Sequence, residues 1–163
     1  MSERWVVNAS PLILLAKVQQ LHLFSLLAET FVVPEAVVAE ILAGPANDLA
    51  RQFLEAQPVT TVAVSASPLV LAWDLGAGET AVLSYALANP GWKAIIDDGA
   101  ARRCAHTLNI PLAGTLAIIL AARQKQLIPV AVPVVQTLLS HGFRVNETTL
   151  KLALWETVSE IWP

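Results

Sequence analysis

Short apolar runs alternate along the chain with longer segments in which apolar residues recur every three or four positions. Short runs bounded by turn residues are typical of buried strands, and the longer spacing is typical of helices that bury one face. The runs predict strands over residues 5–7, 31–33, 59–64, 92–96 and 110–112. The longer segments predict helices that start at Ser10 and that cover residues 21–28, 34–43, 47–56, 79–88, 100–108, 115–126, 133–140 and 146–160. Alternating strands and helices indicate an α/β fold with a mainly parallel sheet.

Residues that favour helix ends support several of these boundaries. Ser10 followed by Pro11 is a common helix start, because serine can accept a backbone N–H bond and proline suits the first helical position. Asn146 is predicted to cap the last helix. Since no repeat, linker or low-complexity tract interrupts the sequence, we expect a single domain over residues 1–163, with 146–163 as a C-terminal helical extension.

The composition is unusually apolar. Hydrophobic residues make up 55% of the chain, charged residues 14%, and the mean hydropathy is +0.59, whereas about 25% charged residues is usual for a globular domain. A membrane span needs roughly 18 or more apolar residues in succession. The longest uncharged stretch, residues 104–122, is interrupted at His106, Asn109, Pro111 and Gly114. We therefore expect no membrane span, and we attribute the apolar excess to a thick core and a contact with another chain.

The first residues and the cysteine content favour a cytoplasmic protein. A secretory signal has a basic start followed by an unbroken apolar run, but here Glu3 and Arg4 are followed within a few positions by Asn8. Cys104 is the single cysteine of the sequence. It excludes an intramolecular disulfide framework and a zinc site made of several cysteines, and it suits a reducing compartment.

Charge is unevenly distributed along the chain, although the formal net charge is only −3. Residues 1–92 hold three basic and eight acidic residues, whereas residues 93–125 hold five basic and two acidic ones. Local positive charge of this kind suits contact with phosphates. The alternative explanation is that these basic residues lie on helix faces exposed to solvent and bind no phosphate. Arg102 and Arg103 are adjacent within the basic segment.

Polar residues follow three of the predicted strands. Asn8 follows the first strand, Asp97 and Asp98 follow the fourth, and Thr115 comes shortly after the fifth. Ligands of open parallel sheets bind outside the carboxyl ends of the strands, where these residues fall. Neighbouring residues on an extended backbone point to opposite sides, so one aspartate can cap the next helix while the other faces the crevice. The sequence leaves open which aspartate does so, and turn or capping roles are the alternative for each residue.

Two glutamates lie on or beside apolar helix faces. Glu79 shares its face with Val82 and Leu83, where an unpaired carboxylate would be costly. Its place in the first helical turn lets the helix dipole offset part of that cost, and a metal ion shared with other carboxylates is the other explanation. Glu40 borders the apolar stripe that contains Ile41, and a solvated surface position is its plain interpretation.

Five short segments together resemble a known family. They are residues 6–13, 33–41, 78–82, 95–103 with its Ile-Asp-Asp motif, and 114–116 with its Gly-Thr-Leu motif. Their order and spacing are similar to those of the PIN-domain family, and nearest to a VapC-like branch long treated as a domain of unknown function. The resemblance covers about residues 4–150.

The resemblance implies a three-layer α/β/α sandwich with a mainly parallel central sheet. It also implies a ribonuclease that depends on Mg²⁺ or Mn²⁺, and often the toxin of a toxin–antitoxin pair. The acidic cluster of the family carries over onto Asn8, Glu40, Glu79 and Asp98 as catalytic and metal-binding residues, with Asp97 as an uncertain neighbour among the metal ligands. Contacts with RNA are predicted for Ser10, Arg102, Arg103 and Thr115.

Asn8 departs from the family pattern, because the family's first aspartate is an amide here. An amide oxygen can coordinate Mg²⁺ but brings no negative charge, so the affinity for the cation should fall. The leading hypothesis is a PIN-type, metal-dependent ribonuclease that acts as the VapC-like toxin of a toxin–antitoxin pair. The alternative is a catalytically weak or inactive module that binds RNA or protein. A third hypothesis is a phosphate- or nucleotide-binding module that uses the turn over residues 76–79.

The last predicted helix carries an apolar stripe that runs toward the C-terminus. The stripe consists of Leu150, Leu154, Val158 and Ile161, flanked by Trp155 and Trp162. Stripes of this kind usually face the core of their own domain. Because this one lies where the family resemblance ends, we expect it to contribute to a homodimer or to an antitoxin contact.

Overall fold

A five-stranded parallel sheet forms the centre of the computed structural model, which describes residues 3–163. The strand order is β3-β2-β1-β4-β5, and each neighbouring pair is parallel. The strands are β1 (Arg4–Val7), β2 (Thr30–Pro34), β3 (Thr61–Val62), β4 (Trp92–Ile95) and β5 (Leu112–Ala113). The α/β class and the parallel sheet predicted from the sequence are confirmed.

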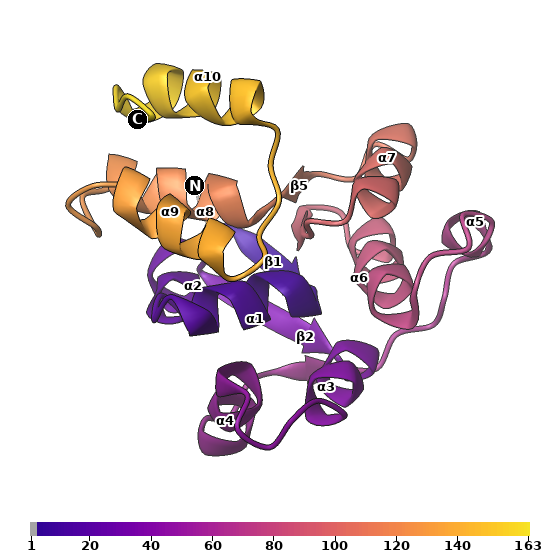
Figure 1. Cartoon of the computed structure of the whole chain (residues 1–163). Coiled ribbons are helices and arrows are strands. Elements are labelled where there is room, and N and C mark those ends of the chain that lie inside the picture. Colours follow the sequence, from indigo (N-terminus) through magenta and orange to yellow (C-terminus); the bar gives the residue numbers. More distant parts are fainter. Residues whose placement is uncertain (1–2) are drawn as a thin grey trace.

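Helices cover both faces of this sheet and complete a three-layer α/β/α sandwich (Figure 1). One layer holds α1 (Ala9–Lys17), α2 (His22–Leu27), α8 (Thr115–Gln124) and α9 (Val132–Ser140), with α10 (Glu147–Val158) packed on α8. The opposite layer holds α5 (Pro68–Leu71), α6 (Ala77–Ala88) and α7 (Gly99–Thr107). At the β3 edge lie α3 (Glu35–Leu42) and α4 (Leu49–Ala56). Within residues 3–163 no helix is both long and apolar enough to span a bilayer.

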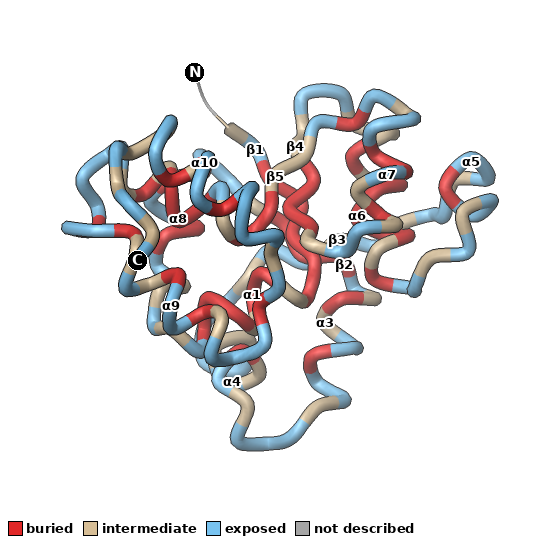
Figure 2. Tube along the Cα trace, turned by 45° about the horizontal axis from the view of Figure 1, so that its top comes forward, coloured by how far each residue is buried: buried red, intermediate tan, exposed pale blue. Residues whose placement is uncertain are grey.

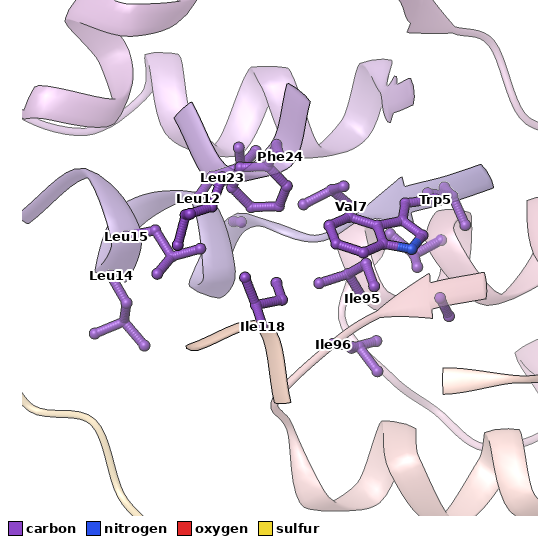
Figure 3. Packing of buried hydrophobic residues seen from close by; sticks show 14 of the residues in the cluster. Trp5, Val7, Leu12, Leu14, Leu15, Leu23, Phe24, Ile95, Ile96 and Ile118 are labelled. Atoms are coloured by element: carbon purple, nitrogen blue, oxygen red, sulfur yellow. The ribbon is translucent and has the colours of Figure 1, made fainter. Parts of the chain in front are cut away.

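The sheet and the inner helix faces enclose one apolar core. Figure 2 shows buried positions concentrated in the central strands and on the sides of the helices that face them. Trp5 of β1 meets Phe24 of α2 edge to face, with ring centroids 6.1 Å apart. Ile95 of β4 and Ile118 of α8 lie near the same Trp5 ring (Figure 3). Because large side chains from four elements fill this space, β1 is fixed at the centre of the sheet.

The strand order creates a switch point between β1 and β4. From β1 the chain moves outward to β2 and β3, then returns to the other side of β1 as β4. The carboxyl ends of these two strands are in register, with Val7 opposite Ile95. Since connections leave a parallel sheet in opposite directions at a switch point, a crevice opens outside the strand ends. Asn8 and Asp97 follow the two strands and therefore meet at this crevice.

The start of α1 differs from the predicted one. The helix begins at Ala9, and Asn8 rather than Ser10 stands in the cap position. The Ser10 hydroxyl instead donates a hydrogen bond to Asp97 Oδ2 at 3.0 Å. The prediction of Ser10 as the helix cap is therefore wrong, because the helix begins before Ser10 and this residue lies inside its first turn.

The region between α4 and α6 also differs from the prediction. The strand expected over residues 59–64 is reduced to Thr61–Val62. It pairs only with the end of β2, at Val33 and Pro34, and proline has no N–H with which to extend the ladder. The short helix α5 was not predicted, although Ser67 and Pro68 repeat the Ser-Pro helix start: the Ser67 hydroxyl caps α5 by accepting a hydrogen bond from the N–H of Leu69.

The C-terminal stripe is divided between the core and the surface. Leu150 and Leu154 are fully buried, and α10 packs on α8. Trp155 and Ile161 are exposed by 58% and 77%, and Leu152 of the same helix is exposed by 55%. The buried leucines belong to the protein's own core, so only the exposed residues remain free to meet another chain.

Glu160 joins the C-terminal segment to α8 and α9. Its carboxylate accepts hydrogen bonds from the N–H groups of Ala131 at 2.9 and 3.0 Å, from the N–H of Val132 at 2.9 Å and from Arg123 Nε at 3.1 Å. Burial acts to raise the pKa of Glu160, but the two backbone donors and Arg123 outweigh it and hold the pKa below its usual value. Glu160 thus closes the start of α9 and fixes the chain after α10.

Replacing this carboxylate should loosen the C-terminal segment. We expect Glu160→Gln to lower the free energy of unfolding by about 1–3 kcal/mol, the range for hydrogen bonds to a charged group. Because the folded-state pKa is lowered, the difference should be complete at neutral pH and disappear as the pH falls through that pKa. Denaturant unfolding at several pH values measures it. Glu156→Gln, an exposed change on α10, is the matched control, and equal losses in both variants would contradict the role of Glu160.

Candidate functional site at the β1–β4 switch point

Asn8 occupies the centre of the candidate site, between β1 and α1. Its backbone N–H donates to the carbonyl of Ile95 at 3.0 Å, and the residue is only 2% exposed. Its Nδ2 lies 3.5 Å from Glu79 Oε1, at the limit of a hydrogen bond. Its Oδ1 is buried and has no donor among residues 3–163. An unpaired buried carbonyl costs about 1–3 kcal/mol, so this oxygen is available to a ligand from outside the chain.

Gly78 allows Glu40 to approach Asn8. A methyl group at position 78 would lie 2.9 Å from Glu40 Oε2 and 3.0 Å from Asn8 Oδ1, which is too close for a carbon atom. The missing side chain on α6 therefore lets the Glu40 carboxylate of α3 and the Asn8 amide both approach Gly78. The family resemblance implied that Asn8 and Glu40 serve one site, and the fold brings both of them close to Gly78.

The two glutamates beside Asn8 influence each other. Glu40 is exposed as a residue, but its carboxylate end lies against Gly78 and Asn8. The loss of water around the carboxylate is the larger cause that raises the pKa of Glu40 above its usual value, and the negative charge of Glu79 is the smaller one. Two carboxylates held around one amide therefore repel each other, and a cation would relieve this repulsion.

Asp97 connects three elements of the site. Its Oδ2 accepts hydrogen bonds from the hydroxyls of Ser10 at 3.0 Å and Thr115 at 2.6 Å. Its Oδ1 accepts the backbone N–H of Thr115 at 2.8 Å. The carboxylate thereby joins the end of β4 to the first turns of α1 and α8. Gly114 permits this approach, since a methyl group there would lie 2.9 Å from Asp97 Oδ1.

Asp98 caps the following helix and also faces the crevice. Its Oδ2 accepts the backbone N–H of Ala101 at 2.9 Å, in the first turn of α7. Both aspartates border a cavity of about 300 Å³, together with Asn8, Ser10 and Glu79. We call this space the acidic cavity. The question left open by the sequence is resolved geometrically: Asp97 and Asp98 both reach the cavity, but Asp97 has three internal donors and Asp98 one.

The glycine turn before α6 does not suit a phosphate. A methyl group at Gly76 would lie 2.6 Å from Glu79 Oε2, so the carboxylate of Glu79 occupies the space over that turn. A phosphate there would meet this negative charge instead of free N–H groups. The geometry therefore disfavours the nucleotide-binding hypothesis based on residues 76–79.

The basic residues predicted to contact RNA lie to one side of the acidic cavity. Arg102 is half-buried and donates to the carbonyl of Ile96 at 3.1 Å, whereas Arg103 is exposed. Neither lines the acidic cavity, but Arg144 does, together with Phe143. No periodicity or motif in the sequence marks Phe143 and Arg144, because only the packing of the α9–α10 connection brings them to the sheet edge.

A family model described as a PIN domain matches residues 4–159. The chain belongs to the PIN-domain family. No curated protein matches the chain. PIN domains are generally nucleases and typically use divalent metal ions, so this PIN domain has a nuclease-type fold, as the resemblance implied. The acidic cavity lies at the carboxyl edge of its sheet.

The donor atoms of this PIN domain are suited to a hard divalent cation, although its acidic residues are spread out. Among residues 3–163, no three His, Cys, Asp or Glu side chains lie close enough together to form a metal cluster. An amide stands between Glu40 and Glu79 instead, and its buried Oδ1 lacks a donor. Oxygen atoms from carboxylates and amides are the ligands that Mg²⁺ and Mn²⁺ accept. The set fits such a cation, with less negative charge than a cluster of carboxylates would supply.

Removing the charge of Glu40 should stabilise the protein in the absence of divalent cations. In the folded protein Glu40 keeps its proton to a higher pH than in the unfolded chain, so ionisation costs stability as the pH rises above the usual value. We expect Glu40→Gln to have a higher Tm than wild type at pH 7 in EDTA, and the difference to vanish below about pH 4.

The control for this prediction lies on the same helix. Glu35→Gln alters an exposed first-turn glutamate whose charge is favourable to the dipole of α3, so its Tm should be unchanged or slightly lower. Mn²⁺ should raise the Tm of wild type more than that of Glu40→Gln, because a ligand stabilises only the state that binds it. A Glu40→Gln variant that is less stable than wild type at pH 7 in EDTA would contradict this account of the site.

Proposed function

We propose that this PIN domain is a metal-dependent ribonuclease that hydrolyses phosphodiester bonds. The observation that carries the proposal is the buried Asn8 Oδ1, which lacks a donor and lies beside the Glu40 carboxylate near Gly78. Asn8, Glu40 and Glu79 together offer oxygen ligands and uncompensated negative charge at the switch point of the sheet. A divalent cation would satisfy both, and its position outside the strand ends is open to a substrate.

Asn8, Glu40, Glu79 and Asp98 are the residues that we propose hold the cation. When bound, Mg²⁺ or Mn²⁺ supplies positive charge that makes a water more acidic and offsets the charge on a phosphate. Asp98 keeps one carboxylate oxygen beyond the one that caps α7. Asp97 is engaged by Ser10 and Thr115, which favours a positioning role for all three residues rather than direct contact with RNA.

Arginine side chains near the cavity support a nucleic-acid substrate. Arg102, Arg103 and Arg144 have no carboxylate within 4.0 Å in the described part of the chain, so their charges are free for phosphates. Binding through such contacts should weaken as salt increases. RNA rather than DNA, and the role of a VapC-like toxin in a cytoplasmic toxin–antitoxin pair, are the parts of the proposal that rest on the family resemblance.

The exposed apolar residues of the C-terminal segment are the proposed protein contact. Leu152, Trp155 and Ile161 are all more than half exposed, which is unfavourable for large apolar side chains in water. We infer that they meet a second copy of the chain or a cognate antitoxin. Leu152 and Trp155 lie on α10 and Ile161 follows it, and none of the three lines the acidic cavity.

A catalytically silent module that binds RNA or protein is the second candidate function. The specific observation in its favour is the amide at position 8, since it removes one negative charge from the centre of the site. The two candidates differ in whether the oxygen atoms around Asn8 bind a cation strongly enough to support turnover.

Cleavage of RNA should depend on the carboxylate of Asp98. Asp98→Asn keeps the capping acceptor for α7 but removes the charge, so the fold should persist while the Mn²⁺-dependent rate falls at least about tenfold. The rate is measured on labelled single-stranded RNA with Mn²⁺ and with EDTA. Asp48→Asn is a matched control, because Asp48 caps α4 in the same way, through the N–H of Arg51. Identical rates in wild type and Asp98→Asn would reject the nuclease proposal.

Restoring a carboxylate at position 8 should strengthen the cation site. A charge added next to Glu40 and Glu79 increases their repulsion when no cation is present and adds attraction when one is bound. We expect Asn8→Asp to bind Mn²⁺ about tenfold or more tightly by calorimetry, and to have a lower Tm in EDTA. Asn109→Asp, a similar change at an exposed turn, should leave both unchanged. An unchanged Mn²⁺ affinity in Asn8→Asp would favour the silent module.

A further inference from the structure

A second cavity of about 390 Å³ adjoins the acidic cavity. The two cavities share Asp97, Phe143 and Arg144 in their walls. The inner wall of the second cavity is apolar and comes from α8 and α10, through residues such as Leu116, Ala117 and Ala153. Polar side chains that also line it are Arg102, Asn146 and Thr149. Its apolar wall and few polar groups are typical of a site for a small organic group.

Arg144 places positive charge at the boundary between the cavities, and Arg102 adds positive charge in the wall of the second cavity. Arg144 lines both cavities, is exposed and has no carboxylate within 4.0 Å among residues 3–163. Arg102 lines the second cavity and donates only to a backbone carbonyl. An anion entering the acidic cavity would meet the carboxylates of Asp97 and Asp98. The most favourable position for a phosphate is therefore beside Arg144, where it does not have to approach those carboxylates.

Asn146 leaves one donor free at the second cavity. Its Oδ1 accepts the N–H of Thr149 at 3.1 Å and so caps α10. Its Nδ2 has no acceptor within hydrogen-bond distance in the described residues. A flat group that enters between the apolar walls could therefore receive one hydrogen bond from Asn146 on its polar edge.

We propose that the second cavity binds the base of one unpaired nucleotide whose phosphate is held at Arg144. A base has flat apolar faces and a polar edge, and the cavity offers apolar walls beside a free amide donor. A base in a duplex must first break its pairing, which costs free energy. The site therefore selects single-stranded RNA. The inference rests on the proposed function and extends it, because it places a flanking nucleotide next to the phosphodiester bond to be cleaved.

Binding experiments in EDTA test this subsite without cleavage. The probes are a fluorescent single-stranded RNA oligonucleotide and a set of copies in which one nucleotide at a time lacks its base. Fluorescence anisotropy gives the Kd of each probe for wild type. Loss of one particular base should weaken binding about five- to a hundredfold, the range for a base held against apolar and aromatic side chains, while bases elsewhere should matter less.

Variants of the cavity wall locate this effect. Ala117→Trp fills the second cavity from α8 and should make the intact and base-free probes bind equally. Ala56→Trp, an exposed change at the end of α4, should keep the discrimination. Arg144→Ala should weaken all probes alike and reduce the dependence of binding on salt by about one phosphate contact. Lys17→Ala, which removes one exposed charge at the far end of α1, should have little effect.

The outcomes separate this inference from the nuclease proposal. If Ala117→Trp keeps the discrimination between probes, or if wild type binds all probes equally or binds none, the subsite is rejected even when RNA is cleaved with Mn²⁺. If the discrimination is present and abolished by Ala117→Trp but no RNA is cleaved, the subsite stands and the nuclease proposal falls. Competition by an unrelated acidic peptide that equals competition by RNA would assign the cavity to a protein partner and also reject the subsite.

Discussion

The Asp97 carboxylate determines how the functional edge of this PIN domain is built. It lies at the end of β4 and receives two hydroxyls and one backbone N–H from α1 and α8. Those helices flank the crevice in which Asn8, Glu79 and Asp98 meet. Because donors from α1 and α8 converge on this one carboxylate, it fixes the spacing of both helices. The remaining site residues can then stay less constrained than Asp97.

Asn8 represents a compromise between stability and affinity for a cation. Glu40 and Glu79 already repel each other beside it, as the raised pKa of Glu40 indicates. A third carboxylate would increase this repulsion in the cation-free protein, whereas the amide contributes an oxygen without charge. The consequence is a buried Oδ1 without a donor. This unpaired oxygen lowers the stability of the cation-free protein, and it also marks the position at which a cation would bind.

Sequence patterns predicted the parallel sheet and the polar residues that follow its strands, because both depend on local spacing, whereas the choice of Glu40 as a site residue came from the family resemblance. Apolar runs locate the strands, and in a parallel sheet their carboxyl ends share one edge, so Asn8, Asp97 and Asp98 had to meet there. The use of the Ser10 hydroxyl by Asp97 was not predictable, since it joins residues 87 positions apart. Arg144 was missed for the same reason. Its place depends on how α10 folds back over α8, and no local periodicity encodes that packing.

The C-terminal helix lines the second cavity, which adjoins the candidate site. Figure 1 shows the α9–α10 connection turning back toward the sheet before α10 lies over α8. This connection supplies Phe143 and Arg144 to both cavities, and α10 supplies Ala153. Glu160 then ties the end of the chain to the start of α9, so the wall of the second cavity is fixed at both ends. A segment that the sequence suggested as a contact for partners therefore also shapes the space next to the acidic cavity.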